Sequence, residues 1–348
     1  MENKFVLNDI NEFVKKFDLI EQLKNKSILI TGGTGLIGSS LIKYIAYASK
    51  QRKLDIEIFG MARSKEKVLS KNFPDNVTWI YQDMKRTLSD EIKVDYIIHT
   101  ASPTQSKYMI SHPVELINDT YIGTRNLLEY AKEHNITKFV YLSSIEVYGQ
   151  MFENKLVTEE NNGYIDQMNV RSCYSEGKRL IECLCSSYAD EYNIPVNVAR
   201  LTQTFGAGVA FDDNRVYSQF CHQILKGDNI ILHTDGESAK NYLYISDAVT
   251  GLITILLKGN VGEAYNLCNE ENYISIYDLA NFLVNNFNKD VSVNIEKKEN
   301  EGYAPVTKVN LSSSKLRKLG WMPSSDLKDS FTKLLNYFSG KDIEDKEK

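Results

Sequence analysis

The stretch SILITGGTGLIG at residues 27–38 decides the fold of this chain of 348 residues. Its apolar first half, Ser27–Thr31, predicts a buried strand, and its second half carries glycine at every third position. Glycines allow a tight turn and a close approach of the backbone to a ligand. The helix expected over Leu36–Tyr47 would then present free N–H groups and the positive end of its dipole. This order of strand, glycine turn and helix predicts a site for the pyrophosphate of a dinucleotide.

Downstream of this stretch, apolar strands alternate with helices. Further strands are expected at Ile56–Met61, Val77–Tyr81, Tyr96–Thr100, Phe139–Ser143 and Val196–Leu201. Long helices are expected at Val114–Glu133 and Tyr174–Tyr192. Apolar strands that alternate with helices form a parallel sheet covered on both faces. The pattern therefore predicts an α/β protein with a Rossmann-type, doubly wound parallel sheet.

The chain divides into four parts by its patterning. Residues 1–25 are expected to form an N-terminal helical extension, because apolar residues recur at helical spacing over 8–24. Residues 26–200 form the expected Rossmann cofactor-binding domain. After Leu201 the alternation becomes irregular, with short strands at Ile230–His233, Tyr242–Ile245 and Ala264–Leu267. Residues 201–340 are therefore predicted to form mainly a smaller C-terminal α/β substrate-binding domain, with a segment near 242–268 that returns to the main sheet. The charged tail, 341–348, is predicted to be disordered.

Composition excludes several classes of function. Hydrophobic residues make up 42% of the chain and charged residues 25%, which is ordinary for a soluble globular protein. The net charge of −5 offers no basic surface for nucleic acid or an anionic membrane. The charged N-terminus has no long apolar stretch, so neither a signal peptide nor a membrane span is expected. The 5 cysteines lack C-x-x-C spacing and are expected as free thiols in a cytoplasmic protein, and no metal site is expected.

The motif YSEGK at residues 174–178 carries the predicted chemistry. Positions i and i+4 of a helix share a face, so Tyr174 and Lys178 can converge on one site. Oxidation of an alcohol needs a base for its proton, and a phenol with a pKa of about 10 is too weakly acidic to serve at neutral pH. A nearby ammonium group and an oxidised nicotinamide both favour the phenolate. The motif therefore predicts hydride-transfer chemistry with Tyr174 as base and Lys178 as its supporting cation.

The strand end YLSSIEVYG, residues 141–149, supplies two further candidate catalytic residues. Ser144 is expected to hydrogen-bond the reacting oxygen and the Tyr174 hydroxyl. Glu146 follows two residues later, so it shares a face with Ser144 if the strand continues. A carboxylate there could remove a proton next to a newly formed ketone.

The predicted cofactor is NAD or NADP. A site that prefers NAD usually has an acidic residue after the second strand, whereas this chain has Arg63 and Lys65 there. A guanidinium pairs well with a phosphate, so Arg63 favours NADP. Asp83 ends the third strand, where an adenine edge would lie. The expected cofactor-binding residues are Gly32, Thr34, Gly35, Leu36, Ile37, Gly38, Arg63, Asp83, Met84, Ala101, Ser102, Tyr174 and Lys178.

Several longer stretches resemble one enzyme family over about residues 26–340. They are ASPTQSKYM (101–109), RSCYSEGKR (171–179), DDNRV (212–216), YLYISDAVTGL (242–252) and KLGW (318–321). These stretches resemble the extended short-chain dehydrogenase/reductase family, also described as NAD-dependent epimerases/dehydratases, whose members mostly act on nucleotide sugars. Within it they look most similar to the UDP-glucuronate decarboxylase (UDP-xylose synthase) branch. The resemblance implies a catalytic triad of Ser144, Tyr174 and Lys178, with Glu146 as the catalytic glutamate of decarboxylases and 4,6-dehydratases.

The resemblance also implies a substrate side, on which this chain departs from the family. The implied substrate-binding residues are Ser102, Pro103, Tyr108, Gln203, Arg215 and Lys240. Dehydratases have an aspartate before the catalytic glutamate, and Ile145 stands there, so dehydration is disfavoured. Thr120 and Gln203 replace asparagines. Lys240 replaces an arginine, which keeps the charge but loses the bidentate fork.

The leading hypothesis is an enzyme that oxidises C4 of a nucleotide-linked sugar with NAD(P) and then decarboxylates or epimerises it, as in polysaccharide biosynthesis. One alternative, favoured by Arg63, is an NADPH-dependent reductase of a nucleotide-linked keto sugar. Another is an inactive nucleotide-sugar-binding protein, against which the intact triad speaks.

A homodimer is expected as well, since the resemblance implies pairing of the helices at 114–133 and 174–192 between two copies. These helices also carry more apolar residues than one sheet face needs. Those residues are Leu127, Leu128, Leu180, Ile181 and Leu184.

Overall fold

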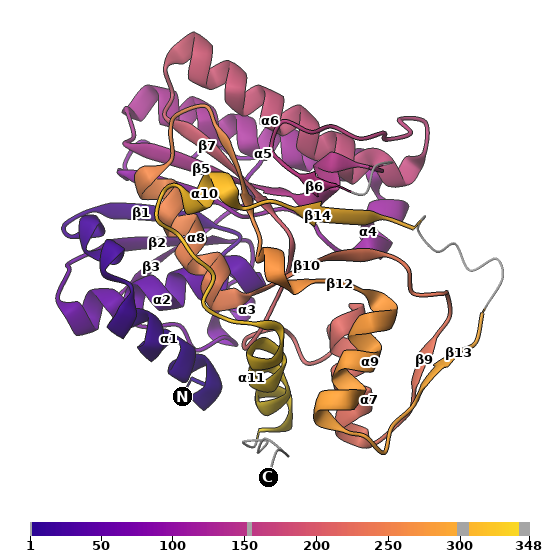
Figure 1. Cartoon of the computed structure of the whole chain (residues 1–348). Coiled ribbons are helices and arrows are strands. Elements are labelled where there is room, and N and C mark those ends of the chain that lie inside the picture. Colours follow the sequence, from indigo (N-terminus) through magenta and orange to yellow (C-terminus); the bar gives the residue numbers. More distant parts are fainter. Residues whose placement is uncertain (1, 152–154, 298–305, 341–348) are drawn as a thin grey trace.

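The computed structural model describes residues 2–151, 155–297 and 306–340 (Figure 1). Its main sheet has seven strands in the order β11-β7-β5-β4-β1-β2-β3, and every neighbouring pair is parallel. The strands are β1 (Ser27–Thr31), β2 (Glu57–Ala62), β3 (Val77–Tyr81), β4 (Tyr96–His99), β5 (Lys138–Ser144), β7 (Val196–Leu201) and β11 (Ala264–Leu267). The predicted doubly wound parallel sheet is confirmed, and β11 joins it from the C-terminal half of the chain.

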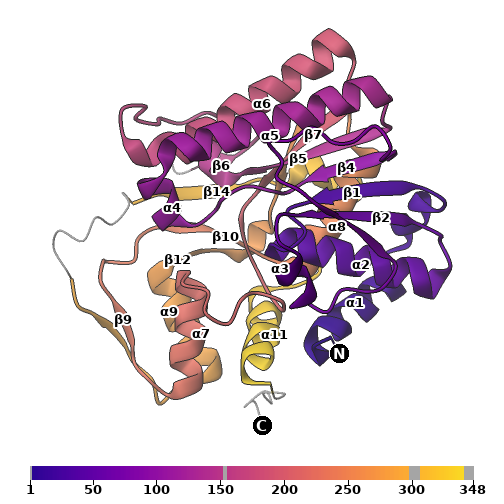
Figure 2. The same ribbon diagram turned by 180° about the vertical axis from the view of Figure 1, so that it is seen from behind.

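Helices cover both faces of this sheet, as Figures 1 and 2 show from opposite sides. Alternate residues of β1 face opposite ways, so Ile28 and Ile30 pack with α2 (Leu36–Arg52) and α8 (Ile245–Lys258). Leu29 packs on the other side with α5 (Pro113–His134) and α6 (Cys173–Tyr192). The sheet is therefore buried on both faces, so polar side chains can meet a ligand at the ends of its strands.

The N-terminal extension is packed, but it is not the single helix expected over 8–24. Helix α1 (Lys4–Lys16) begins earlier, after Asn3 accepts a hydrogen bond from the Phe5 N–H. Phe17 then leaves the helical conformation, and a 3-10 helix, η1 (Asp18–Leu23), follows. The break allows both pieces to bury apolar side chains against α2 and α8, because each piece takes its own direction.

The C-terminal half contributes a second, mixed sheet in the order β12-β10-β14-β6, with β8 beside β10. These strands are β6 (Leu156–Val157), β8 (Gln203–Phe205), β10 (Ala239–Tyr244), β12 (Tyr273–Ser275) and β14 (Lys308–Leu311). A separate pair is formed by β9 (Ile230–Leu232) and β13 (Val293–Ile295). Helices α7 (Val216–Lys226), α9 (Ile276–Phe287) and α11 (Leu327–Ser339) share an apolar core with them. The strand expected at Tyr242–Ile245 is β10, which ends one residue earlier because Ile245 begins α8.

Short elements complete the chain between these larger ones. They are α3 (Lys65–Leu69), α4 (Ser106–Ser111), α10 (Ser314–Arg317) and the 3-10 helices η2 (Ile145–Tyr148), η3 (Val170–Ser172) and η4 (Glu270–Asn272). All five cysteines are free, as expected. In the part of the chain that the structure describes, no helix has the length and apolar character needed to cross a membrane. The tail expected to be disordered, 341–348, lies outside the described residues.

Most of the apolar residues that suggested a dimer face are part of the protein's own core. The side chains of Leu127 and Leu128 in α5 and of Ile181 in α6 are buried in one apolar cluster, and Leu184 packs against that cluster. Of that group, Leu180 is the one exposed side chain, at 46%. The argument from these residues is therefore wrong, because both helices need apolar residues for the sheet and for each other. The large apolar side chains that α5 does expose are Val114, Ile117 and Tyr121, at i, i+3 and i+7.

Candidate active site

The candidate site lies where β1, β4 and β5 end, at the carboxyl edge of the parallel sheet. Ligands of open α/β sheets bind outside this edge. Strand β5 ends at Ser144, whose side chain caps the following 3-10 helix, η2, by accepting a hydrogen bond from the Glu146 N–H at 3.2 Å. The strand therefore does not continue to Glu146 as the shared-face argument required, and the cap holds the two residues together instead.

The structure brings Tyr174 and Ser144 into contact. Their hydroxyl groups are joined by a side-chain hydrogen bond, and Tyr174 is buried in the first turn of α6. Lys178, one turn later, is buried as well and donates a hydrogen bond from Nζ to the Leu142 carbonyl at 2.8 Å. Its Nζ lies 5.7 Å from the centre of the Tyr174 ring. The three residues of the expected triad are thus neighbours, fixed by one strand end and one helix.

Burial dominates the titration of this group. It raises the pKa of Tyr174, and the charge of Glu146 raises it further. Burial also lowers the pKa of Lys178 to about 7. The expectation that Lys178 and an oxidised nicotinamide together favour the phenolate stays a prediction, because it depends on the bound cofactor. At neutral pH the side chains leave Tyr174 protonated.

Glu146 is held by two side chains that were not predicted from the sequence. Its Oε2 lies 3.5 Å from Nη1 of Arg171 and 3.3 Å from the Ser175 hydroxyl, which donates to it. Both residues belong to the stretch RSCYSEGKR and flank Tyr174 by three residues and one residue. Their closeness to Tyr174 in the sequence was a signal for a place near the site. Nothing in the sequence pattern, however, predicts that they pair with Glu146.

The glycine loop fits a dinucleotide. Gly32 has a φ of +66°, and a Cβ there would lie 2.8 Å from the Ala101 backbone. A Cβ on Gly38 would lie 2.3 Å from the Gly32 carbonyl oxygen, so the first turn of α2 can approach the loop only with glycine at this position. Gly35 is the N-cap of α2 and supplies no side-chain bond to the helix, which leaves the first N–H groups to a ligand.

Two buried polar groups near this loop also fit a bound ligand. They are Nε2 of Gln82, the residue before Asp83, and the hydroxyl of Ser102. Neither has a hydrogen-bond partner within the described part of the chain. A buried polar group without a partner costs free energy, so such groups usually serve a ligand or water. The residues present are therefore compatible with NAD.

The remaining expected cofactor residues lie at the ends of β2, β3 and β4. Arg63 is exposed directly after β2, and Asp83 is half-buried after β3. Met84 packs against Gly123 of α5, where its Cε would lie 2.6 Å from an added Cβ. Ala101 and Ser102 follow β4, and Thr34, Leu36 and Ile37 line the glycine turn. All of these residues share the carboxyl edge with Tyr174.

The expected substrate residues fall into two groups. Lys240 of β10 lies near Glu146, since the charges of Glu146, Arg171 and Arg215 act on it, and burial lowers its pKa. The Arg215 side chain donates three hydrogen bonds to Asp213, from Nε to Oδ1 at 2.9 Å, from Nε to Oδ2 at 3.0 Å and from Nη2 to Oδ2 at 2.6 Å.

The other group lies on different elements. Gln203 begins β8 beside β10. Ser102 and Pro103 precede α4, on which Tyr108 stacks against His112 at 4.9 Å. Tyr108 packs against the apolar cluster that contains Tyr174, whereas no hydrogen bond or ion pair among the described residues joins Ser102, Pro103 or Gln203 to Glu146.

Two of the departures noted in the sequence have clear surroundings. Ile145 is partly buried against Val147 and Tyr148, so it has an apolar role. Thr120 is buried in α5, and its hydroxyl has no partner among the described residues. An asparagine there would reach further than this hydroxyl.

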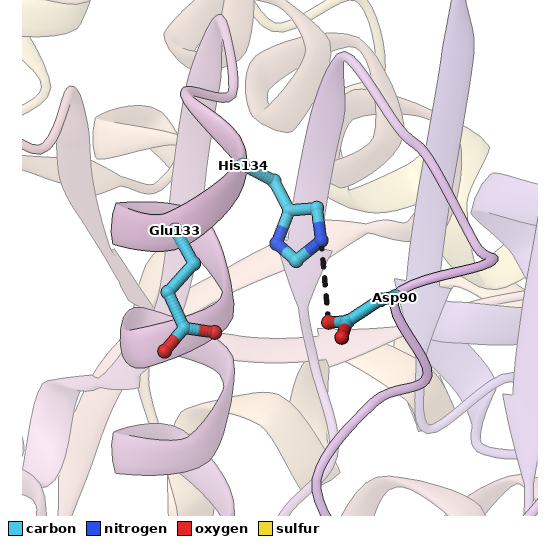
Figure 3. Close-up of side chains that lie close together, drawn as sticks. All are labelled: Asp90, Glu133 and His134. Carbon is cyan, nitrogen blue, oxygen red and sulfur yellow. Dashed lines mark ion pairs between the residues drawn. The ribbon is translucent and has the colours of Figure 1, made fainter.

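One group of possible metal ligands lies away from the site. Asp90, Glu133 and His134 bring one ligand atom each within 4.8 Å of the others, and His134 Nε2 is 3.5 Å from Asp90 Oδ1 (Figure 3). They precede β4 and β5, so they lie at the amino edge of the sheet, opposite to Tyr174. Asp90 and Glu133 are exposed. We therefore assign this cluster no part in the chemistry.

Comparisons with known proteins bear on this arrangement. A model of the NAD dependent epimerase/dehydratase family matches residues 28–268. UDP-glucuronic acid decarboxylase 1 of Xenopus tropicalis is 31% identical over 330 residues, which are 94% of this chain and 76% of that protein.

Solved structures share the fold. An epimerase from Methanothermobacter thermautotrophicus superposes with a TM-score of 0.78 at 21% identity, covering 94% of this chain and 96% of that one. A UDP-glucuronic acid 4-epimerase from Bacillus cereus, in complex with NAD, does so with a TM-score of 0.73 at 22% identity, covering 90% and 99%.

Proposed function

Since the chain belongs to the NAD-dependent epimerase/dehydratase family, we propose that it oxidises C4 of a nucleotide-linked sugar to a ketone and then decarboxylates or epimerises the sugar. When bound, the oxidised nicotinamide accepts a hydride from C4 and can later return it. Tyr174 takes the proton of the C4 hydroxyl, and Ser144 hydrogen-bonds the same oxygen. Lys178 supplies positive charge behind Tyr174 and would contribute to binding the cofactor.

Glu146 acts after the ketone has formed. A ketone acidifies the hydrogen on the neighbouring carbon, and a carboxylate held beside it can remove that proton or assist loss of CO2. The observation that carries the proposal is this carboxylate, placed next to the hydrogen-bonded pair of Tyr174 and Ser144. An enzyme that only transfers hydride needs no such group.

The substrate side supports a nucleotide diphosphate sugar. Arg215 and Lys240 supply positive charge toward the C-terminal half, and Ser102, Pro103, Tyr108 and Gln203 would complete the contacts. We propose NAD or NADP as cofactor, with Arg63 favouring NADP because it is exposed at the end of β2, where a 2′-phosphate would lie. That preference also supports the alternative of an NADPH-dependent keto-sugar reductase.

The first experiment is a substrate panel. The purified protein is incubated with UDP-, CDP-, GDP- and dTDP-linked sugars, UDP-glucuronic acid among them, with and without added NADPH. Products are identified by mass spectrometry and NMR in D2O. Ring deuterium or CO2 supports the proposal, whereas a reduced sugar formed only with added NADPH supports the reductase.

Glu146→Gln separates the two functions further. If the proposal holds, this nearly isosteric variant still forms reduced cofactor in a single turnover but stalls there, with product formation lowered by about 10²–10⁴-fold. If the protein is a reductase, the loss stays below about tenfold, because no proton moves at carbon. Glu191→Gln, an exposed carboxylate at the far end of α6, is the control and should match the wild type.

We also propose a homodimer formed through α5 and α6. Val114, Ile117 and Tyr121 expose an apolar row on α5, and Leu180 is exposed on the neighbouring helix, α6. The two helices lie side by side on the outer face of the sheet, as both views show (Figures 1 and 2). A second copy of the same surface would bury this row.

A further inference from the structure

We propose that Arg171 is a positioning residue of this site, which together with Ser175 holds the Glu146 carboxylate and offsets its negative charge beside Tyr174. The inference rests on the proposed function, because it assigns Arg171 a part in the step that Glu146 performs. Among the described residues, the Arg171 side chain makes no hydrogen bond or ion pair with Tyr174 or Lys178; it binds Glu146 and acts on Tyr174 by its charge.

The geometry brings two donors to one oxygen. Arg171 Nη1 and the Ser175 hydroxyl both lie within 3.5 Å of Glu146 Oε2, and the two residues are four positions apart. Arg171 belongs to η3, whose start is fixed by Asn169, which accepts a hydrogen bond from the Arg171 N–H at 2.9 Å. Helix α6 continues from η3 without a gap, so the same backbone that carries Tyr174 also sets the position of Arg171.

Glu146 has no comparable support from its own element. It lies in a 3-10 helix of four residues directly after β5, and its side chain is 38% exposed. A side chain of this kind keeps several rotamers unless a partner selects one. Arg171 and Ser175 are the partners of this carboxylate in the described part of the chain, and they direct it toward the first turn of α6.

Charge provides the second part of the argument. Several groups face Tyr174: Tyr141 of β5, Glu146 of η2, Arg171 of η3, Tyr108 of α4, and Cys173 and Lys178 of α6. Lys240 of β10 lies behind Glu146 and Arg171. The negative charge of Glu146 opposes ionisation of the Tyr174 hydroxyl, and the positive charge of Arg171 favours it. The ion pair therefore allows a carboxylate to stand beside a phenol that must lose its proton.

The test uses Arg171→Gln, Arg171→Lys and the double variant with Glu146→Gln. The probe is the nucleotide sugar of the panel that the wild type oxidises fastest. Two quantities are measured against pH: single-turnover formation of reduced cofactor, and entry of solvent deuterium into the sugar ring. Arg52→Gln is the matched control, since Arg52 also pairs with carboxylates, Asp18 and Glu21, but at the amino edge of the sheet.

In Arg171→Gln, the pH profile of cofactor reduction should move upward by about 0.5–1 unit, because Glu146 then acts on Tyr174 uncompensated. Deuterium entry should slow by about 10–10²-fold. Arg171→Lys should restore the pH profile, since it restores the charge, while regaining part of the exchange rate.

The double variant identifies the route. With Glu146→Gln already present, Arg171→Gln should slow deuterium entry by less than about twofold, since no carboxylate remains to be positioned, whereas the direct charge of Arg171 still acts on the pH profile of Tyr174. A merely structural role would lower both rates equally at every pH and in both backgrounds, and that outcome would overturn the inference. A wild-type protein that oxidises no sugar of the panel contradicts the proposed function itself, whereas a wild-type profile for Arg171→Gln contradicts this inference alone.

Discussion

Replacing Asp9 by asparagine should change the pH dependence of stability in a predictable way. Asp9 lies in α1 and is 4% exposed, with Tyr244 Oη donating to it at 2.7 Å and Lys333 Nζ at 3.4 Å. Helices α1 and α11 lie side by side there, near the two ends of the described chain (Figure 1). Burial raises the pKa of Asp9 from 3.8 to about 6, despite these two partners.

The sign and size follow from linkage. A group whose pKa is raised in the folded state favours folding while it is protonated, and it loses that contribution as the pH rises through the folded pKa. A shift of about two pKa units costs about 3 kcal/mol of the free energy of unfolding once the carboxyl group is ionised, at about 1.4 kcal/mol per unit. Most of this cost appears between pH values of about 4 and about 6. The asparagine side chain would keep an acceptor for Tyr244 but would not ionise.

The assay is urea unfolding of the wild type and Asp9→Asn at several pH values. The stability of Asp9→Asn relative to the wild type should rise by about 2 kcal/mol between about pH 4.5 and about pH 7.5. Asp329→Asn, which removes a more exposed carboxylate that pairs with the same Lys333 and leaves Asp9 in place, is the matched control. A difference for Asp9→Asn that is constant across this range would refute the argument that burial controls this carboxyl group.

Three further predictions concern the site and its surroundings. Tyr174→Phe should bind cofactor normally but lose at least about 10³-fold in turnover, and a rate within about tenfold of the wild type would contradict its role as base. Arg63→Asp should shift the ratio of kcat/KM from NADP toward NAD, because it removes the phosphate partner and adds an acceptor for the ribose; an unchanged ratio would refute the assignment. The wild type should have the mass of a dimer in light scattering at micromolar concentration, and Leu180→Glu together with Tyr121→Glu should give monomers, whereas a monomeric wild type would exclude this interface.

Local patterns were sufficient for the sheet and for part of the site. Ser27–Thr31 and the glycines after it specify a strand, a turn and a helix within a dozen residues, because each depends on side-chain periodicity and backbone freedom. Tyr174 and Lys178 lie one helical turn apart, so their convergence follows from the geometry of any helix. These features were predictable since the interacting residues are close in the sequence.

Contacts between distant segments required the tertiary structure. Glu146 and Arg171 are separated by 25 residues, and their pairing depends on where β5 ends and how η3 approaches it. The apolar residues of α5 and α6 gave a misleading dimer face, since the sequence cannot tell which of them the sheet already covers. The break at Phe17 likewise depends on packing against distant helices, since α1 contacts α2 and α8 and η1 contacts α8. Periodicity determines which residues seek burial, but the partner that buries or charges each one is determined by packing across the whole chain.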